Sequence, residues 1–323
     1  KMNFTSYKNG TTEGYCVVKT AEVKTNVKGV PYCDLTLSDQ SGEINAKIWD
    51  YKGDLHGEYA PGDFVKVRGT LSKYNNVDQF RIDRIRHVRE EDGVDVSQFV
   101  PSSEYPGQNM LNEIYTYIDK IRDEELQLLT RAIIKDNEGK LLFWPAAFKL
   151  HHAIRGGLLY HTLSVLKLAD AVAKIYPSVD RDLLFSGAIL HDICKIDEFD
   201  VNNIGMVKSY SVKGELLGHL VMGAMEIAQK AKELSISEEK ALLLEHMIIS
   251  HHGDPEFGAA VRPMTLEAEI LSQLDTLDAT VYEISAAVSG VEDGEFTQRQ
   301  WALDNRKLFN HGRKPVAPKA NLL

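Results

Sequence analysis

The apolar residues near the start of the chain alternate with polar ones. Residues 32–37 have this period of two, a turn with Asp, Ser and Gly follows at 39–42, and residues 44–49 alternate again. The pattern predicts a β-hairpin. Residues 63–69 and 79–85 have the pattern of two further strands. About five short strands in this length predict a small closed barrel.

A different pattern begins at residue 110. Met110, Ile114 and Ile118 recur at a spacing of four residues, which predicts an amphipathic helix. Asp123 has the position of an N-cap for a second helix, and the chain beyond it is helical in character. Residues 91–109 are rich in acidic and turn-forming residues without periodicity, and we predict a linker there.

A chain of 323 residues is too long for one typical core, since single cores stop growing near ~250 residues. We therefore expect a multi-domain protein: an all-β barrel at residues 1–90, the linker at 91–109, an all-α domain at 110–315 and a C-terminal tail at 316–323. Apolar side chains on the helices of residues 110–135 could pack on the helical core or join copies of the chain. A homo-oligomer is therefore compatible with the pattern but not required by it.

The longest apolar runs, 183–190 and 242–249, are far shorter than the ~20 residues that a membrane span needs. The N-terminal residues lack the apolar stretch of a secretory signal, so we expect a cytoplasmic protein without membrane contact. Three cysteines without paired spacing argue against a disulfide framework and against a thiolate zinc site.

The formal net charge of −10 argues against a protein that holds nucleic acid by bulk electrostatics alone. Lys and Arg slightly outnumber Asp and Glu in residues 1–90, so the acidity lies in the predicted helical domain. A carboxylate-rich domain can still bind phosphates through divalent cations, because the ions reverse the sign of the local field.

Metal-binding side chains recur in separated apolar segments of the helical part. These are His161, His191-Asp192, His219, His251-His252 and Asp275. Imidazole nitrogens and carboxylate oxygens are ligands for divalent cations. Asp278 lies one helical turn beyond Asp275, so it could replace Asp275 as a ligand or orient a ligating imidazole. We predict Asp275.

The order H, HD, H, HH, D resembles the HD phosphohydrolase superfamily. The resemblance implies that His161, His191, Asp192 and Asp275 hold one divalent cation. It also implies that Asp192 bridges to a second cation held by His219, His251 and His252. Lys195 completes an H-D-x-x-K sequence and could stabilise charge on the phosphate or protonate the leaving group, or it could be an exposed lysine after a helix end.

The segment FKLHHAIRGGLLYHT places a cluster of cations and imidazoles before the helix of His161. This predicted substrate-binding cluster is Lys149, His151, His152 and Arg155. Such residues at a helix start could bind substrate phosphates. Local capping and packing explain them equally well.

The phrases LTLSDQSGEINAKIWD and GDFVKVRGTL resemble the OB-folds of nucleic-acid-binding proteins. Tyr32, Lys47 and Trp49 then share the outer face of the hairpin, where aromatic rings could stack on bases of a single strand. Trp49 could instead pack against a neighbouring domain. Arg68 could contact phosphates or be a solvated residue of a strand edge.

The segments HHAIRGGLLYHT, ILHDICKIDEF and IISHHGDPEFGAAVRPMTLEAEILSQLDTLDA, together with the OB-fold, resemble the YhaM-type 3′-to-5′ exoribonucleases. That resemblance implies release of nucleoside 5′-monophosphates from single-stranded RNA, and it could extend to single-stranded DNA. It also implies manganese as the cofactor. Ligation rich in imidazole is suitable for manganese, cobalt or iron, and it is less suitable for magnesium. Cys194 stands where many relatives of the motif have glycine.

Two alternatives remain from the sequence. The first is an HD phosphohydrolase that acts on small nucleotides, which would have no evident need of an OB-fold. The second is a replication or regulatory factor that binds single strands and has a vestigial HD site. All the expected ligands are present, which disfavours the second alternative.

Overall fold

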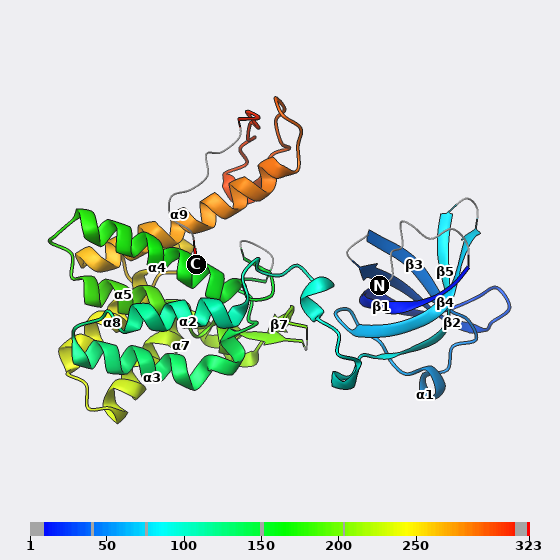
Figure 1. Cartoon of the computed structure of the whole chain (residues 1–323), viewed down its shortest axis with the longest axis horizontal. Coiled ribbons are helices and arrows are strands. Elements are labelled where there is room, and N and C mark those ends of the chain that lie inside the picture. The colour runs from blue at the N-terminus through cyan, green and yellow to red at the C-terminus, as the bar shows by residue number, and fades with distance from the viewer. Residues whose placement is uncertain (1–9, 40–41, 75–76, 149–151, 203, 314–321) are drawn as a thin grey trace. The chain divides into compact units, whose positions relative to one another are not determined.

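The computed structural model describes residues 10–39, 42–74, 77–148, 152–202, 204–313 and 322–323 (Figure 1). The chain divides into two compact units. The first contains residues 1–102 and 201–208, and the second contains residues 103–200 and 209–323. The predicted linker at 91–109 is thus shared between the units, and the sequence pattern did not indicate that 201–208 joins the first unit.

The first unit is built on a closed five-stranded barrel in the order β1-β2-β3-β5-β4 (Figure 1). Strands β3 and β5 pair in parallel and the other neighbours pair antiparallel. Its elements are β1 (Gly10–Thr25), β2 (Pro31–Asp39), β3 (Gly42–Ile48), the short helix α1 (Gly53–His56), β4 (Phe64–Tyr74) and β5 (Val77–His87). The predicted OB-type barrel is therefore confirmed.

The alternation in the sequence decides which side chains fill the barrel. Leu35 and Leu37 of β2 are fully buried, and Ala46 of β3 lies opposite Leu35. Phe80 of β5 is the largest fully buried side chain of the barrel. Position 69 of β4 requires glycine, because a Cβ there would collide with the carbonyl of Arg81 on β5.

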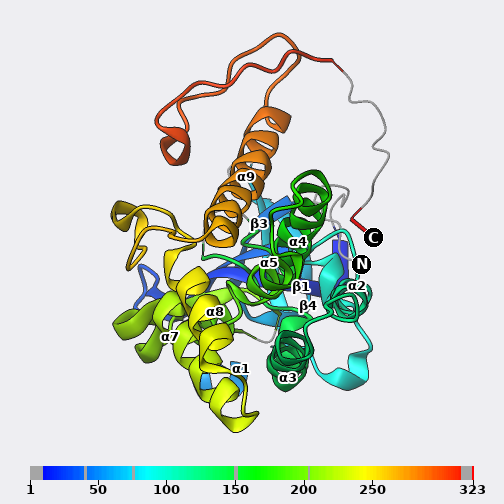
Figure 2. The same ribbon diagram turned by 90° about the vertical axis from the view of Figure 1, so that its left-hand side faces the viewer.

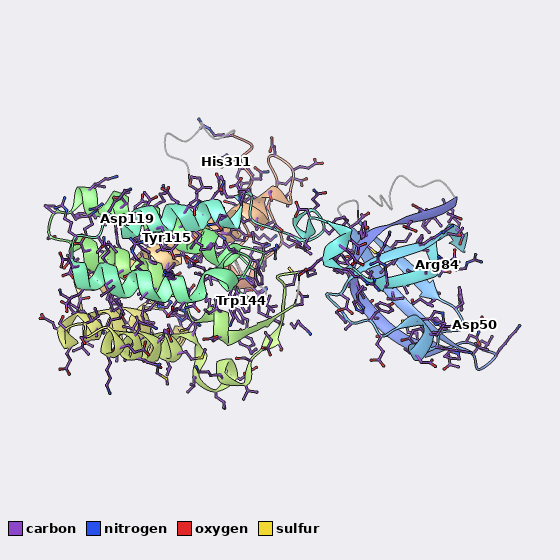
Figure 3. The ribbon with its side chains drawn as sticks, turned by 60° about the horizontal axis from the view of Figure 1, so that its bottom comes forward. Asp50, Arg84, Tyr115, Asp119, Trp144 and His311 are labelled. Carbon is purple, nitrogen blue, oxygen red and sulfur yellow. The ribbon has the colours of Figure 1, made fainter. Side chains whose placement is uncertain are left out.

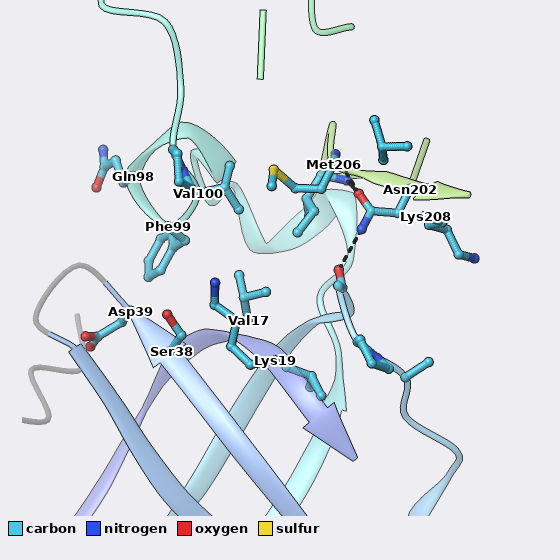
Figure 4. A pocket seen from close by; sticks show the side chains of 17 residues that line it. Val17, Lys19, Ser38, Asp39, Gln98, Phe99, Val100, Asn202, Met206 and Lys208 are labelled. Carbon is cyan, nitrogen blue, oxygen red and sulfur yellow. Dashed lines mark hydrogen bonds between the residues drawn. The ribbon is translucent and has the colours of Figure 1, made fainter. Parts of the chain in front are cut away.

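Residues 201–208 form the tip of a hairpin whose strands are β6 (Phe199–Val201) and β7 (Val207–Tyr210). Within the first unit, Asn202 Nδ2 donates a hydrogen bond to the carbonyl of Gly62, and Asn202 Oδ1 accepts from Met206 N (Figure 4). A cavity of about 740 Å³ lies beside this contact, lined by residues of the barrel, the hairpin tip and the segment around Phe99 (Figure 4).

The second unit is mainly helical (Figure 2). Asp123 caps α3 as predicted, because its carboxylate accepts from the amides of Glu125 and Leu126. Helix α5 is buried from Leu183 to Leu190 and lies at the centre of the unit. The helices are α2 (Gly107–Ile118), α3 (Glu124–Leu141), α4 (Gly157–Ile175), α5 (Arg181–Leu190), α6 (Lys195–Glu198), α7 (Val212–Glu233), α8 (Glu238–Ser250) and α9 (Leu266–Ser289).

The apolar residues of α2 pack inside this unit. Met110, Ile114 and Ile118 are fully buried, so they belong to the helical core and do not form an exposed interface. Within the described part of the chain, no helix is both long and apolar enough to cross a membrane.

The predicted helical domain is not helical throughout. Strands β6 and β7 interrupt it, and after α9 the chain forms isolated bridges between Phe296 and Phe309 and between Gln300 and Arg306. The side chains of β7 are almost all exposed, so they gave no alternating apolar signal. The second half of α9 has no fully buried residue after Leu274 and extends beyond the other helices (Figure 2).

Candidate metal centre and nucleic-acid surface

The predicted metal-binding residues come from helix ends and helix faces around α5. His161 lies in the second turn of α4, and His191 is the C-cap of α5. His251 is the C-cap of α8. His219 follows a break in α7, where Gly218 has a φ of 69°. Helix ends free the backbone to turn, and so these side chains can point toward one centre.

The first group of donors surrounds His161, whose ring is fully buried. Its Nε2 lies 2.9 Å from Asp275 Oδ1, 3.1 Å from His191 Nε2 and 3.5 Å from Asp192 Oδ2. His191 Nε2 lies 3.5 Å from the same oxygen of Asp192. The structure therefore brings together all the residues predicted for the first cation.

The second group of donors surrounds the other oxygen of Asp192. Asp192 Oδ1 lies 3.3 Å from His219 Nε2 and 3.5 Å from His251 Nε2. Donor atoms of His219, His251 and His252 lie within 4.8 Å of one another. Asp192 therefore lies between the two groups and offers one oxygen to each.

Backbone carbonyls fix the protonation of most of these rings. The Nδ1 atoms of His191, His251 and His252 lie 2.8, 2.7 and 3.1 Å from the carbonyl oxygens of Ala188, Ile248 and Phe257. A carbonyl oxygen can only accept, so each Nδ1 must carry the proton. In the neutral ring the Nε2 atom then has a free lone pair, which is the form that binds a metal ion.

Unpaired buried atoms test whether a cation suits this centre. Among the described residues, Asp192 Oδ1, His219 Nε2 and His251 Nε2 are buried without a hydrogen-bond partner. Such atoms are costly to bury unless something binds them. All three are electron-pair donors aimed at one another, so a divalent cation fits between them.

The electrostatics of the centre also favour positive charge. Burial on its own would raise the pKa of Asp192, but Lys195 and the surrounding imidazoles hold it well below its usual range. Burial opposes the charged form of His161, but the carboxylates of Asp275 and Asp278 outweigh it and raise its pKa to about 10. The carboxylates therefore stay ionised and attract cations.

Asp278 contacts the opposite side of the His161 ring. Its Oδ2 lies 2.7 Å from His161 Nδ1 and 2.8 Å from His152 Nε2. Asp275 therefore faces the donor centre, and Asp278 orients the imidazole from behind, as a carboxylate often does for a metal-binding histidine.

The predicted substrate-binding cluster is only partly described. Lys149 and His151 lie outside the described residues. His152 is 1% exposed and its ring packs 4.1 Å from that of Tyr282, so it contacts protein and not solvent. Arg155 is half-buried, with its guanidinium 5.2 Å from the ring centre of Phe143.

Lys195 is buried, and it is not the exposed lysine that the sequence also allowed. Its Nζ donates a hydrogen bond of 2.7 Å to Asp192 Oδ2. Its carbonyl accepts a hydrogen bond of 2.9 Å from the indole N–H of Trp144. The Lys195 ammonium is therefore held against Asp192, the carboxylate that the two donor groups share.

Sequence reasoning missed Glu198, which holds His219. Glu198 Oε1 accepts from the amide of His219 at 3.1 Å, and both carboxylate oxygens lie 3.0 Å from His219 Nδ1. Its position one helical turn after Lys195 was the available signal. That signal is weak because Asp197, next to it, is an exposed acid of the ordinary kind.

Replacing Glu198 by alanine is expected to weaken binding at the second donor group by about 10- to 100-fold, because His219 loses the carboxylate that orients it. Calorimetric titration with Mn²⁺ measures this, and the first donor group should retain its affinity. Glu215→Ala removes an exposed acid from the same helix as His219 and serves as the control. Unchanged affinity at both groups would contradict the orienting role.

The barrel carries the predicted aromatic cluster on its outer face. The ring centres of Tyr32 and Trp49 are 5.0 Å apart, and Lys47 Nζ lies 4.7 Å from the centre of the Tyr32 ring. Trp49 is 41% exposed. A partly exposed ring pair beside a cation has the composition of a surface that binds single-stranded nucleic acid.

Arg68 belongs to another part of the barrel. It lies on β4 opposite Arg84 of β5 (Figure 3). Both line a cavity of about 570 Å³ that Lys66 and Arg86 also line. Glu13 and Asp83 line it too, and Glu13 pairs with Lys66, so the barrel has a groove in which cations outnumber acids, in addition to the aromatic cluster of Tyr32, Lys47 and Trp49.

Comparison with known families agrees with both parts of the architecture. Residues 17–88 match the family described as an OB-fold nucleic acid binding domain. Residues 158–280 match the HD domain family, and this range contains every residue of the two donor groups.

Three curated relatives are similar over nearly the whole chain. The 3′-5′ exoribonuclease YhaM of Bacillus subtilis (strain 168) is 40% identical over 296 residues, which cover 91% of this chain and 93% of that protein. The YhaM proteins of Bacillus licheniformis and of Geobacillus sp. (strain WCH70) are each 40% identical, over 94% of this chain and 95% and 91% of theirs. The chain therefore belongs to the YhaM family of 3′-5′ exoribonucleases.

Proposed function

We propose that this protein is a metal-dependent hydrolase that removes nucleoside 5′-monophosphates from the 3′ end of single-stranded RNA. The observation that carries the proposal is the convergence of the donor atoms on the two oxygens of Asp192. The curated relatives are 3′-5′ exoribonucleases, which supports the substrate and the direction.

The donor groups would hold two divalent cations. The first cation would be bound by His161, His191, Asp192 and Asp275, and the second by Asp192, His219, His251 and His252. When bound, such a pair of cations would supply a nucleophile from water near neutral pH and would stabilise negative charge on the phosphodiester and on the leaving oxygen. Donors rich in imidazole suit Mn²⁺, Co²⁺ or Fe²⁺ better than Mg²⁺, which prefers oxygen ligands.

Three further residues of the chain orient the metal-binding side chains or could act on the phosphate. Lys195 places its ammonium 2.7 Å from Asp192 Oδ2, where it could stabilise charge on a phosphate oxygen or give a proton to the departing 3′ oxygen. Asp278 keeps His161 in one orientation, and Glu198 does the same for His219. Two of the metal-binding imidazoles are thus fixed by carboxylates of the chain itself.

The barrel would deliver the strand. Tyr32 and Trp49 would stack on bases beside Lys47, and Arg68 would contact phosphates. Stacking does not distinguish RNA from DNA, so single-stranded DNA could bind to the same surface.

Trp49→Ala is expected to weaken binding of a single-stranded oligonucleotide by about 5- to 100-fold, because stacking on one aromatic residue contributes about 1–3 kcal/mol. Fluorescence anisotropy with a labelled RNA measures the change. Val77→Ala removes a side chain of β5 that is 65% exposed and lines neither the aromatic cluster nor the groove of Arg68, and it is the control. Equal binding by Trp49→Ala and the control would argue against the aromatic cluster.

The proposal as a whole is tested with RNA labelled at either end. Incubation with and without Mn²⁺ should give a ladder of shortened 5′-labelled products and immediate release of labelled mononucleotide from the 3′-labelled strand. Free nucleotides in parallel reactions should stay intact. Turnover of free nucleotides without degradation of RNA would favour an HD enzyme of small nucleotides.

A further inference from the structure

Two partly exposed aromatic side chains lie together in the second unit. Phe148 is 36% exposed and Tyr210 is 42% exposed, and their ring centres are 5.9 Å apart with 37° between the planes. Phe199 is buried and packs edge-on against Tyr210, with the ring centres 5.2 Å apart and 66° between the planes. The Tyr210 ring therefore packs against a buried ring, and part of it faces solvent.

The backbone ties this aromatic pair to the metal centre. The amide of Ser211, the residue after Tyr210, donates a hydrogen bond of 2.9 Å to the carbonyl of Glu198. Ser211 Oγ donates to the carbonyl of Asp197. The carboxylate of Glu198 in turn holds His219. Tyr210 therefore lies beside the residue that orients the second donor group.

Exposed aromatic rings beside a phosphodiesterase centre have a natural ligand in a nucleobase. Stacking on aromatic rings is how proteins bind unpaired bases without regard to sequence. Tyr210 is held in place by Phe199, so little side-chain freedom would be lost on binding. The aromatic cluster on the barrel is built from different residues, so this pair would be a separate contact for the strand.

We propose that Phe148 and Tyr210 form a stacking platform for a base at the 3′ end of the strand, and that this contact positions the scissile phosphate at the metal centre. The inference rests on the proposed function. Phe148 and Tyr210 would bind the substrate and not the metal. Replacing either of them should therefore lower the activity only on strands that carry a base at the 3′ end.

The test compares two RNA oligonucleotides of one length in the presence of Mn²⁺. One has ordinary nucleotides throughout, and the other has 3′-terminal nucleotides that lack the base. On the ordinary strand, Tyr210→Ala and Phe148→Ala should each lower kcat/KM by about 5- to 100-fold, mainly through KM. On the strand without terminal bases, wild type should itself be slow, so the variants and wild type should converge.

Further variants keep the outcome interpretable. Tyr210→Phe retains the ring and should retain most of the activity, while Tyr210→Leu keeps an apolar side chain without stacking and should resemble Tyr210→Ala. Tyr176→Ala removes a ring that is 56% exposed at the far end of α4, about 22 Å along the helix from His161, and is the matched control.

Equal losses on both oligonucleotides would overturn the inference, because they would indicate damage to the metal centre. Variants as active as wild type on the ordinary strand would overturn it as well, and in both cases the proposed function would stand. Wild-type protein that degrades no RNA would instead overturn the proposed function and this inference with it.

Discussion

Asp192→Asn is expected to lower the rate of RNA hydrolysis by on the order of 1000-fold or more. Asp192 is 2% exposed, and its two oxygens face different donor groups. An amide would offer one neutral oxygen and one nitrogen that cannot bind a cation, so at least one group would lose its shared ligand. Loss of electrostatic stabilisation at a single position already costs about 100- to 1000-fold.

The measurement is kcat at saturating Mn²⁺ together with the metal content of the purified protein. Affinity for a single-stranded oligonucleotide should stay within severalfold of wild type, because the barrel is untouched. Asp197→Asn makes the same change at an exposed carboxylate near the centre, and it should leave kcat almost unchanged. Wild-type rates in Asp192→Asn would remove the metal hypothesis.

Much of the barrel could be predicted because β2 and β3 alternate between buried and partly exposed side chains, whereas β1 lacks this alternation and no segment was predicted for it. Leu35 and Leu37 alternate with polar residues and are fully buried, as a strand with one face in a core requires. The association of residues 201–208 with the first unit is a contact between positions more than a hundred residues apart. The local periodicity of the sequence cannot predict such a contact.

The candidate site could be predicted as a set of residue types but not as a geometry. Asp275 and Asp278 are one helical turn apart, and the rotation of α9 about its axis decides which of them meets His161 Nε2. Glu198 and Asp197 are adjacent acids, and the packing of α6 against α7 decides which of them is buried. Both choices depend on tertiary packing.

His152 illustrates the same limit for substrate contacts. A run of cations and imidazoles before a helix suggests phosphate binding, yet the His152 ring is buried against Tyr282 and holds Asp278. Its backbone has a φ of 55°, a left-handed conformation that neighbouring residue types do not predict. Its side chain therefore points to a place that the sequence pattern did not indicate.

Lys195→Met is expected to lower kcat by about 100- to 1000-fold while KM changes little. The two side chains have similar length, so the variant removes the charge and leaves little space unfilled. If the ammonium stabilises the phosphate or protonates the leaving oxygen, its contribution appears only as the bond breaks. Lys213→Met removes an exposed cation near the start of α7 and should have little effect on kcat.

If Lys195 had a purely structural role, kcat of Lys195→Met would depend on Mn²⁺ in a different way. Its Nζ lies 2.7 Å from Asp192 Oδ2, so without metal it also neutralises a buried carboxylate. If that were its whole contribution, cations bound to Asp192 would replace it, and kcat of Lys195→Met would return to the wild-type value as Mn²⁺ rises. A loss of kcat that persists at saturating Mn²⁺, with two ions bound per chain, would assign Lys195 to the chemical step.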